Sequence, residues 1–288
     1  MSIESPVIGY TLGDQAGIGP EVITAALTQA PRGATYRLIG KHIDCIPGHP
    51  TQETAEFALE HLEMAAAALK SGRIDAVVTA PICKEALHRI GFNYPGQTEF
   101  FADRMGVKDF AMCLTGKHLT VVLCTTHKAI SQVPQLLSTK EIVRVATLLT
   151  RFLQRTGKPT PRLALAGLNP HNGENGAFGD EESRIIAPAL PILQELLPTA
   201  HFDGPCVPDC VYRDAAQGQY DGIVAPYHDQ ALIPLKLIDF DNAVNATIGL
   251  PRLRVSPDHG TAFGIAGKGI ANPASTIRAF ELALRSVQ

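Results

Sequence analysis

Short apolar runs alternate with longer segments of helical periodicity, and this alternation limits the possible folds of the chain more than any other feature. From Gln52 to Ser71 the apolar residues recur at helical spacing. Strands that alternate with helices of about 10 to 20 residues predict an α/β fold with a mostly parallel sheet. We interpret six segments as strands: 7–12, 35–40, 76–81, 110–126, 162–169 and 221–226. The segment 110–126 is interpreted as two strands that turn at Thr115–Gly116.

Composition excludes several classes of protein. The chain has 288 residues, which is typical of two domains, and its 45% hydrophobic and 18% charged residues suffice for a large core. A net charge of −3 gives no electrostatic basis for binding nucleic acid or a membrane surface. No apolar run is long enough to span a membrane, and no secretion signal is visible. The six cysteines do not resemble a disulfide framework, so we expect a reducing cytoplasm.

Three histidines each follow a predicted strand. His127, His171 and His228 come after the strands at 119–126, 162–169 and 221–226. Ligands of open α/β sheets bind beyond the carboxyl ends of the strands, and imidazole is the commonest protein ligand for divalent transition metals. The positions are therefore compatible with a metal site, although each histidine can equally be an ordinary loop residue.

The remaining motifs are less specific. No G-x-G-x-x-G follows a strand and no P-loop is present, so neither nucleotide-binding fingerprint is supported. The backbone of Gly17–Pro20, at a predicted helix start, is suited to an anion. Lys236, Asn245 and Arg254 are candidate polar site residues, but each can also be a surface residue. From the residues alone we infer an α/β enzyme with an anionic substrate, with or without a metal.

Several stretches together resemble one known family, the 4-hydroxythreonine-4-phosphate dehydrogenases. They run from residue 13 to the C-terminus and read GDQAGIGPEV, TAPICKEAL, YPGQTEF, CTTH, GLNPHNGENGAFGDEE, YHDQALIPLK and NATIGLPRLRVSPDHGTAFGIAGKG. The segment 259–273 is also similar to the nicotinamide-cofactor loop of isopropylmalate and isocitrate dehydrogenases. The resemblance implies their two-domain α/β fold without a Rossmann fingerprint. The implied domains are 1–96 with 255–288 on the cofactor side, and 97–254 for metal, substrate and dimerisation.

The resemblance also assigns roles to individual residues. The implied metal ligands, for Zn, Mg, Co or Mn, are His127, His171 and His228. The implied substrate contacts, with Lys236 as the proton-transfer group, are Gln97, Thr98, Lys236, Asn245 and Arg254. The implied contacts to NAD or NADP are His259, Gly260, Thr261, Ala262 and Asn272.

The implied reaction is metal-dependent oxidation of 4-phosphooxy-L-threonine by NAD or NADP. Decarboxylation to 3-amino-2-oxopropyl phosphate follows, in pyridoxal phosphate biosynthesis, and the family is a homodimer with shared active sites. Relatives of the family oxidise 4-phospho-D-threonate, 4-phospho-D-erythronate or dihydrodiols of aromatic acids, and these substrates stay open. A phosphate acyltransferase and a non-catalytic metabolite-binding protein are the alternatives from other classes.

The chain departs from the family pattern at three places. The segment between residues 40 and 52 is short, Gln97 replaces the usual histidine, and Gly264 replaces the usual aspartate. Glutamine keeps an N–H donor but cannot carry the positive charge of a histidine, so we expect a weaker phosphate contact at residue 97.

Overall fold

The computed structural model describes residues 5–288, which form two compact units. Of the described residues, one unit consists of 5–109 with Val244–Gln288 and the other of Phe110–Ala243. These boundaries differ from the expected divisions after residues 96 and 254. The reason is packing: helix α4 (Gln97–Met105) packs on helix α2 (Gln52–Ser71), and strand β9 (Val244–Ile248) pairs with strand β10 (Leu253–Pro257), so α4 and β9 belong to the first unit.

The strands of the first unit lie in the hydrogen-bonded order β2-β1-β3-β10-β9. Strands β2 (Thr35–Leu38), β1 (Val7–Thr11), β3 (Ala76–Thr79) and β10 are parallel, and β9 is antiparallel to β10. All four residues of β3 are buried, as expected for a central strand covered on both faces. The expected α/β class with a mostly parallel sheet is confirmed.

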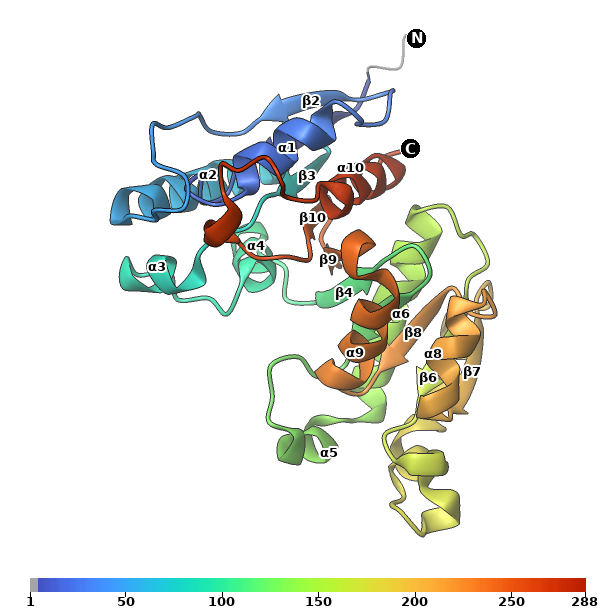
Figure 1. Ribbon diagram of the computed structural model, residues 1–288. Coiled ribbons are helices and arrows are strands. Elements are labelled where there is room, and N and C mark those ends of the chain that lie inside the picture. Colours follow the sequence, from blue (N-terminus) through green and yellow to red (C-terminus); the bar gives the residue numbers. More distant parts are fainter. Residues whose placement is uncertain (1–4) are drawn as a thin grey trace. The chain divides into compact units, whose positions relative to one another are not determined.

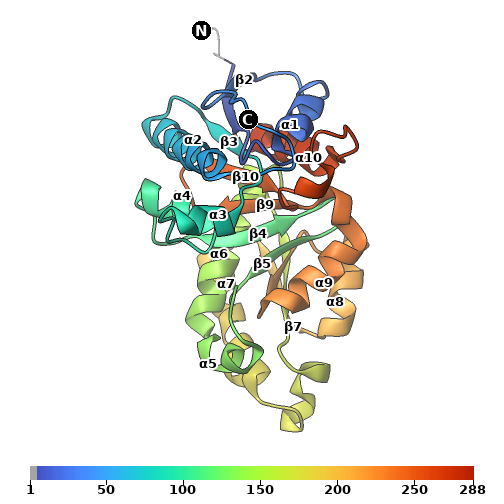
Figure 2. The ribbon, with the colours of Figure 1, turned by 60° about the vertical axis from the view of Figure 1, so that its left-hand side comes forward.

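Helices cover both faces of this sheet (Figure 2). Helices α1 (Gly19–Leu27) and α10 (Ala274–Arg285) pack together on one face, while α2 and α4 lie on the other, with α3 (Lys84–Arg89) against α2. Helix α2 coincides with the predicted helix. Thr51 caps its first turn through a reciprocal capping box, and Gly72 ends it at a φ of 76°.

The strands of the second unit lie in the hydrogen-bonded order β4-β5-β8-β6-β7. Strands β4 (Ala111–Thr115) and β5 (Thr120–Leu123) are antiparallel, as the turn at Thr115–Gly116 predicts. Strands β8 (Gly222–Ala225), β6 (Arg162–Ala166) and β7 (His201–Cys206) continue in parallel from β5. The carboxyl ends of β5, β8 and β6 therefore lie at one edge of the sheet.

Helices also cover both faces of the strands in the second unit (Figure 1). Helices α6 (Thr139–Arg155) and α7 (Ala189–Leu196) pack on one face, and α8 (Pro208–Ala216) and α9 (His228–Asp239) on the other; a short helix, α5 (Val133–Leu136), precedes α6. Between β6 and β7, a π-helical turn at Glu182–Ile186 precedes α7. Within residues 5–288, no helix has the length and apolarity that a membrane span requires.

Candidate active site

Two of the three predicted metal ligands lie side by side in the second unit. His127 follows β5, and His228 is the first residue of α9, just after the neighbouring strand β8. Their ring centroids are 5.7 Å apart. Nδ1 of His228 lies 2.6 Å from Oδ1 of Asp229, a contact that fixes the ring and directs Nε2 away from the carboxylate. The pair thus has the donor chemistry of half a metal site.

His171 lies in an unusual turn after β6. From His171 to Asn175 every φ is positive, between 44° and 77°, and only Gly173 in this run is a glycine. Non-glycine residues lose about 1–2 kcal/mol each in this left-handed conformation, so the surrounding structure must enforce it.

The turn is held by buried polar contacts. Oε1 of Glu182, which is 3% exposed, accepts hydrogen bonds from the backbone N–H groups of Leu168 and Asn169, both at 2.7 Å. Nδ2 of Asn172 donates to the Pro205 carbonyl oxygen at 2.7 Å. His171 itself is exposed, and its ring lies near Phe178. Among the described residues, no group of three His, Cys, Asp or Glu side chains is close enough to hold a metal ion, so His171 does not complete the histidine pair within this chain.

A buried cation occupies the first unit. Arg254, on β10, is 2% exposed. Arg254 stands directly opposite Thr247 of β9 and is paired with Val77 of β3. Thr79 lies two residues after Val77, so its side chain points to the same face. The side chains of Arg254, Thr247 and Thr79 therefore share one face of the sheet. Nε and Nη2 of Arg254 donate to Oγ1 of Thr79 at 3.0 and 2.8 Å, and Nη1 lies 3.5 Å from Oγ1 of Thr247. Burial lowers the pKa of Arg254 to about 9, and the charge of Glu99 opposes this shift.

Helix α4 brings the other predicted substrate residues to the same face. Oγ1 of Thr247 donates to Oγ1 of Thr98 at 3.3 Å, and the Phe101 ring lies 5.8 Å from the Arg254 guanidinium carbon. Nε2 of Gln97 donates to the Ala80 carbonyl oxygen at 3.3 Å. Oε1 of Gln97 and Oδ1 of Asn245 are buried acceptors without a partner in the described structure. These atoms are suited to hydrogen-bond donors of a bound ligand.

The predicted cofactor loop, residues 259–273, is anchored to the first unit. The Thr261 carbonyl oxygen accepts a hydrogen bond from Ile18 N–H at 2.9 Å, and Gly17 approaches so closely that a Cβ there would clash with Thr261. Ala262 has a φ of 43°. Nε2 of His259 is buried without a partner in the described structure. Gly260 and Gly264 border open space, so a ligand can approach the backbone there.

Asn272 also has a structural role, at the start of helix α10. Its Oδ1 accepts a hydrogen bond from Ala274 N–H at 3.0 Å, in the first turn of α10.

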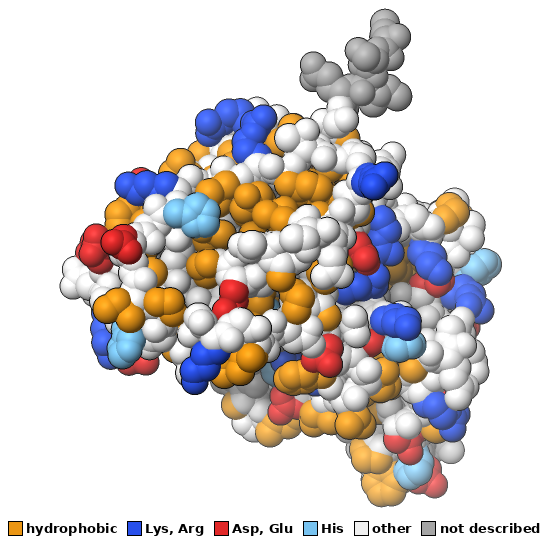
Figure 3. All heavy atoms as spheres, turned by 45° about the horizontal axis from the view of Figure 1, so that its top comes forward, with side chains coloured by type: hydrophobic (Ala, Val, Ile, Leu, Met, Phe, Trp, Pro, Cys, Tyr) orange, Lys and Arg blue, Asp and Glu red, His pale blue; other side chains and the backbone are white. Residues whose placement is uncertain are grey.

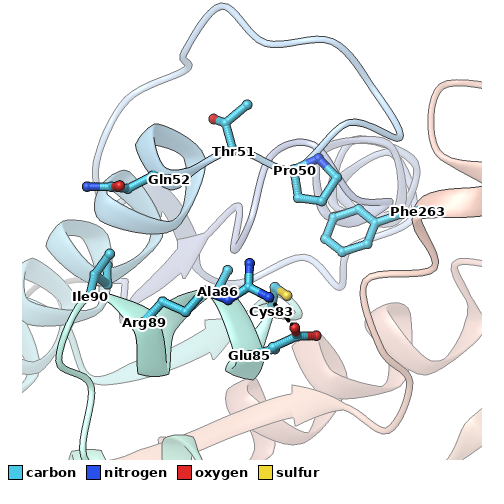
Figure 4. Close-up of a pocket in the computed structure, with 9 residues that line it drawn as sticks. All are labelled: Pro50, Thr51, Gln52, Cys83, Glu85, Ala86, Arg89, Ile90 and Phe263. Carbon is cyan, nitrogen blue, oxygen red and sulfur yellow. Dashed lines mark hydrogen bonds and ion pairs between the residues drawn. The ribbon is translucent and has the colours of Figure 1, made fainter.

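A pocket of about 390 Å³ adjoins this loop (Figure 4). Phe263 and Pro50 form one side of it, and Cys83 and Arg89 come from α3 and the residue before it. Pro50 belongs to the short segment between residues 40 and 52. The pocket volume lies within the usual range for small-molecule sites.

Lys236 lies apart from the histidine pair. It is in the last turn of α9, two turns after His228, which is about 12 Å along a helix axis. Its Nζ lies 5.9 Å from the centroid of the Phe240 ring. The backbone positions of Lys236 and His228 are therefore well separated along α9.

The surface agrees with the near-neutral charge. Figure 3 shows positive and negative side chains interspersed across one face. Apolar side chains are exposed along α9 and just beyond it: Ile233 is 68%, Leu237 84% and Phe240 66% exposed. An exposed apolar stripe of this kind is typical of an interaction surface.

Comparison with known proteins now decides the family. The model of the family described as pyridoxal phosphate biosynthetic protein PdxA matches residues 18–283. The chain belongs to the PdxA family. A 4-hydroxythreonine-4-phosphate dehydrogenase from Bradyrhizobium diazoefficiens is 44% identical, over 96% of this chain and 81% of the relative. A D-threonate 4-phosphate dehydrogenase from Pectobacterium atrosepticum is 37% identical over 98% of this chain and 99% of the relative.

Solved structures agree with the PdxA assignment. The crystal structure of 4-hydroxythreonine-4-phosphate dehydrogenase from Klebsiella pneumoniae has a TM-score of 0.84 and 38% identity, covering all of both chains. Isocitrate dehydrogenase from Methylococcus capsulatus, at 16% identity and a TM-score of 0.53, shares the fold alone. The expected dehydrogenase-like fold is confirmed, and membership of PdxA makes the chain an oxidoreductase rather than an acyltransferase or a non-catalytic binder.

Sequence reasoning missed Thr79, Thr247 and Glu182. The threonines lie inside strands, where a β-branched residue is ordinary, and only the strand register reveals that they face Arg254. Glu182 directly follows the GENGAFGDE stretch, close to His171 in sequence. Nothing in the sequence, however, distinguishes a buried carboxylate from a solvated one.

Proposed function

We propose that the chain oxidises 4-phosphooxy-L-threonine with a nicotinamide cofactor, and that the product loses CO2 to give 3-amino-2-oxopropyl phosphate in pyridoxal phosphate biosynthesis. The observation that carries the proposal is Arg254, a buried cation whose hydrogen-bond partners are uncharged hydroxyl groups. The charge of Glu99 acts on Arg254, but the hydrogen bonds of the guanidinium go to neutral groups, and an anionic substrate can supply a directly bonded negative charge.

The reaction balances without a further co-reactant. The secondary alcohol loses its carbon-bound hydrogen as hydride and its hydroxyl hydrogen as a proton, which leaves a ketone. The β-keto acid then breaks the bond to its carboxylate, and the electron pair stays on the α-carbon, which takes up a proton. When bound, a nicotinamide accepts the hydride and a divalent cation polarises the alcohol oxygen and then the carbonyl. We retain Lys236 as the proposed proton-transfer group.

The residues present fit both cofactors. For the nicotinamide cofactor, the buried unpaired Nε2 of His259 and the open backbone at Gly260, Thr261 and Ala262 are suited to a nucleotide, with Asn272 at the end of the loop. For the metal, His127 and His228 offer two imidazoles, and the strained turn presents His171 to solvent. Zn, Mg, Co and Mn all remain candidates, as do NAD and NADP.

A second chain can supply the missing ligand, which supports a homodimer with shared active sites. His171 is exposed and does not complete the histidine pair of its own chain. The apolar stripe at the end of α9 offers a surface for such a contact. The six free cysteines support a reducing, cytoplasmic location.

D-threonate 4-phosphate is the second candidate substrate, because the Pectobacterium relative that bears this name covers 98% of the chain. The two candidates differ at C2, where one carries an ammonium group and the other a hydroxyl. Both groups donate hydrogen bonds, so the unpaired acceptors of Gln97 and Asn245 suit either.

A substrate panel tests the proposal. Each candidate, together with 4-phospho-D-erythronate and an aromatic-acid dihydrodiol, is incubated with NAD or NADP and a divalent metal, and reduced nicotinamide is followed by absorbance. We expect the highest kcat/KM with 4-phosphooxy-L-threonine, and loss of turnover on chelation that metal restores. A higher kcat/KM with D-threonate 4-phosphate would make that compound the assigned substrate. Activity after exhaustive chelation would contradict a metal requirement.

A further inference from the structure

The hydrogen-bond directions around Arg254 determine which donors are left for a ligand. A guanidinium has five N–H groups, and its contacts to Thr79 and Thr247 use three of them. Nε and Nη2 both bond Thr79, so the edge of the guanidinium formed by these two nitrogens is occupied. Because Nη1 also bonds Thr247, one N–H group remains on Nη1 and one on Nη2. These two remaining N–H groups, here called the Arg254 fork, can each donate a hydrogen bond to an oxygen of a carboxylate or phosphate.

The two threonine hydroxyls are themselves oriented. Oγ1 of Thr79 donates to the Val255 carbonyl oxygen at 3.4 Å, so its lone pairs are available to the guanidinium. Oγ1 of Thr247 donates to Oγ1 of Thr98 and faces Nη1 of Arg254 as an acceptor. Thr98 thus accepts from Thr247, and its own O–H is available to donate to a ligand. The relay leaves three donors, two from Arg254 and one from Thr98.

We propose that Thr79 and Thr247 are positioning residues, which orient the Arg254 fork and the Thr98 hydroxyl toward an oxyanion of the substrate. Both threonines are fully buried, so neither side chain is a surface contact. The proposal rests on the proposed function, because it takes Arg254 and Thr98 to be substrate contacts. What it adds is that Thr79 and Thr247 set the geometry of the Arg254 and Thr98 contacts.

The test compares Thr79→Val, Thr79→Ser and Thr247→Val with a matched control. Valine keeps the shape of threonine and removes only the hydroxyl. The control is Thr11→Val, because Thr11 is fully buried, pairs with Thr79 in the neighbouring strand β1, and has no hydrogen-bond partner for its hydroxyl in the described structure. Thermal unfolding first establishes that each variant folds.

The readouts are KM and kcat for 4-phosphooxy-L-threonine and the inhibition constant of inorganic phosphate. We expect Thr79→Val to raise KM and the inhibition constant about tenfold or more with a smaller change in kcat, and Thr79→Ser to restore them. Thr247→Val should raise both constants about threefold, because its bond to Arg254 is longer. In an Arg254→Lys background Thr79→Val should have little further effect, because the two side chains act as one unit.

Each outcome decides the proposal. Unchanged constants in a folded Thr79→Val or Thr247→Val variant would overturn it, as would additive effects of Thr79→Val and Arg254→Lys. If Thr79→Val does not fold, Thr247→Val decides alone. Failure of the proposed function is seen separately: wild-type enzyme would then turn over no phosphorylated substrate, whatever the variants do.

Discussion

At the scale of single residues, the chain places a positive charge where water cannot reach it. Arg254 is held by hydroxyls rather than by a carboxylate, and burial lowers its pKa to about 9. In the free enzyme the folded state therefore binds fewer protons than the unfolded chain above about pH 9, and the cost of burying the charge is fully present below that pH. An anionic substrate offsets this cost only while the guanidinium is charged.

This predicts the pH dependence of substrate binding. KM for a phosphorylated substrate should be constant near neutrality and rise as the pH passes about 9, because Arg254 then loses its proton. Initial rates across the alkaline range, corrected for kcat, measure it. The Arg254→Lys variant serves as control, since its ammonium titrates differently. A wild-type KM that stays flat to pH 10 or above would contradict the assignment of Arg254.

At the scale of elements, the sequence predicted correctly those elements whose determining residues lie close together along the chain. Helix α2 was predicted from its periodicity, and its cap and its terminal glycine lie within a few residues of its ends. Strands β9 and β10 were not predicted, because Asn245 and Arg254 interrupt their apolar pattern and β3, the other partner of β10, is distant in sequence. The left-handed turn at His171 depends on Glu182 and Pro205, which no local rule connects to it. The three strand-end histidines were found, but the separation of His171 from the other two was not.

The turn gives a prediction of stability. Asn175 is exposed with a φ of 55°, so Asn175→Gly should stabilise the fold by up to about 1 kcal/mol, because glycine adopts this conformation without a steric penalty. Chemical denaturation measures the change. Asn93→Gly, also at an exposed loop residue but without a positive φ, is the control and should not stabilise. Equal effects at both positions would contradict the strained turn.

Asn272 provides a second prediction for an element. Asn272→Ala should lower the free energy of unfolding by about 1 kcal/mol through loss of the contact to Ala274, and should also weaken cofactor binding. Asn272→Ser keeps an acceptor at the start of α10, so it should restore stability but not cofactor affinity. Unfolding and fluorescence of bound NADH or NADPH separate the two effects. If Asn272→Ser restores both, Asn272 acts only on the helix.

At the scale of the whole molecule, the histidines point to a site that one chain does not complete. His127 and His228 form a pair, while the turn at 171–175 presents the third histidine to solvent. The proposed homodimer, in which His171 serves the other chain, would account for this arrangement. The exposed apolar side chains of α9 are the surface proposed for it.

The dimer predicts an effect of a charge on that surface. Leu237→Glu should convert a dimer into monomers and abolish activity, because it buries a carboxylate in the interface. Sedimentation equilibrium measures the mass. Leu196→Glu, at an apolar residue of α7 that is 53% exposed, is the control and should remain dimeric. A wild-type monomer with full activity would exclude shared sites.

Mixing experiments test the sharing directly. Inactive His127→Ala and His171→Ala subunits, unfolded together and refolded, should regain part of the wild-type activity, because one of the two sites in the mixed dimer has all its histidines. His127→Ala mixed with His228→Ala should regain none, since the two losses then fall in different sites of every mixed dimer. Recovery in both mixtures, or in neither, would contradict the arrangement.

The turn at 171–175 has a further consequence for chemistry on the chain itself. Its backbone has the handedness that mirror-image amino acids prefer, because for a D-residue the left-handed region is the relaxed one. A version of the protein assembled by ligation with D-asparagine at position 175 should keep the loop while removing a strained L-residue. Proteases that require L-residues would no longer cut at this position, so the exposed loop that carries His171 would resist proteolysis.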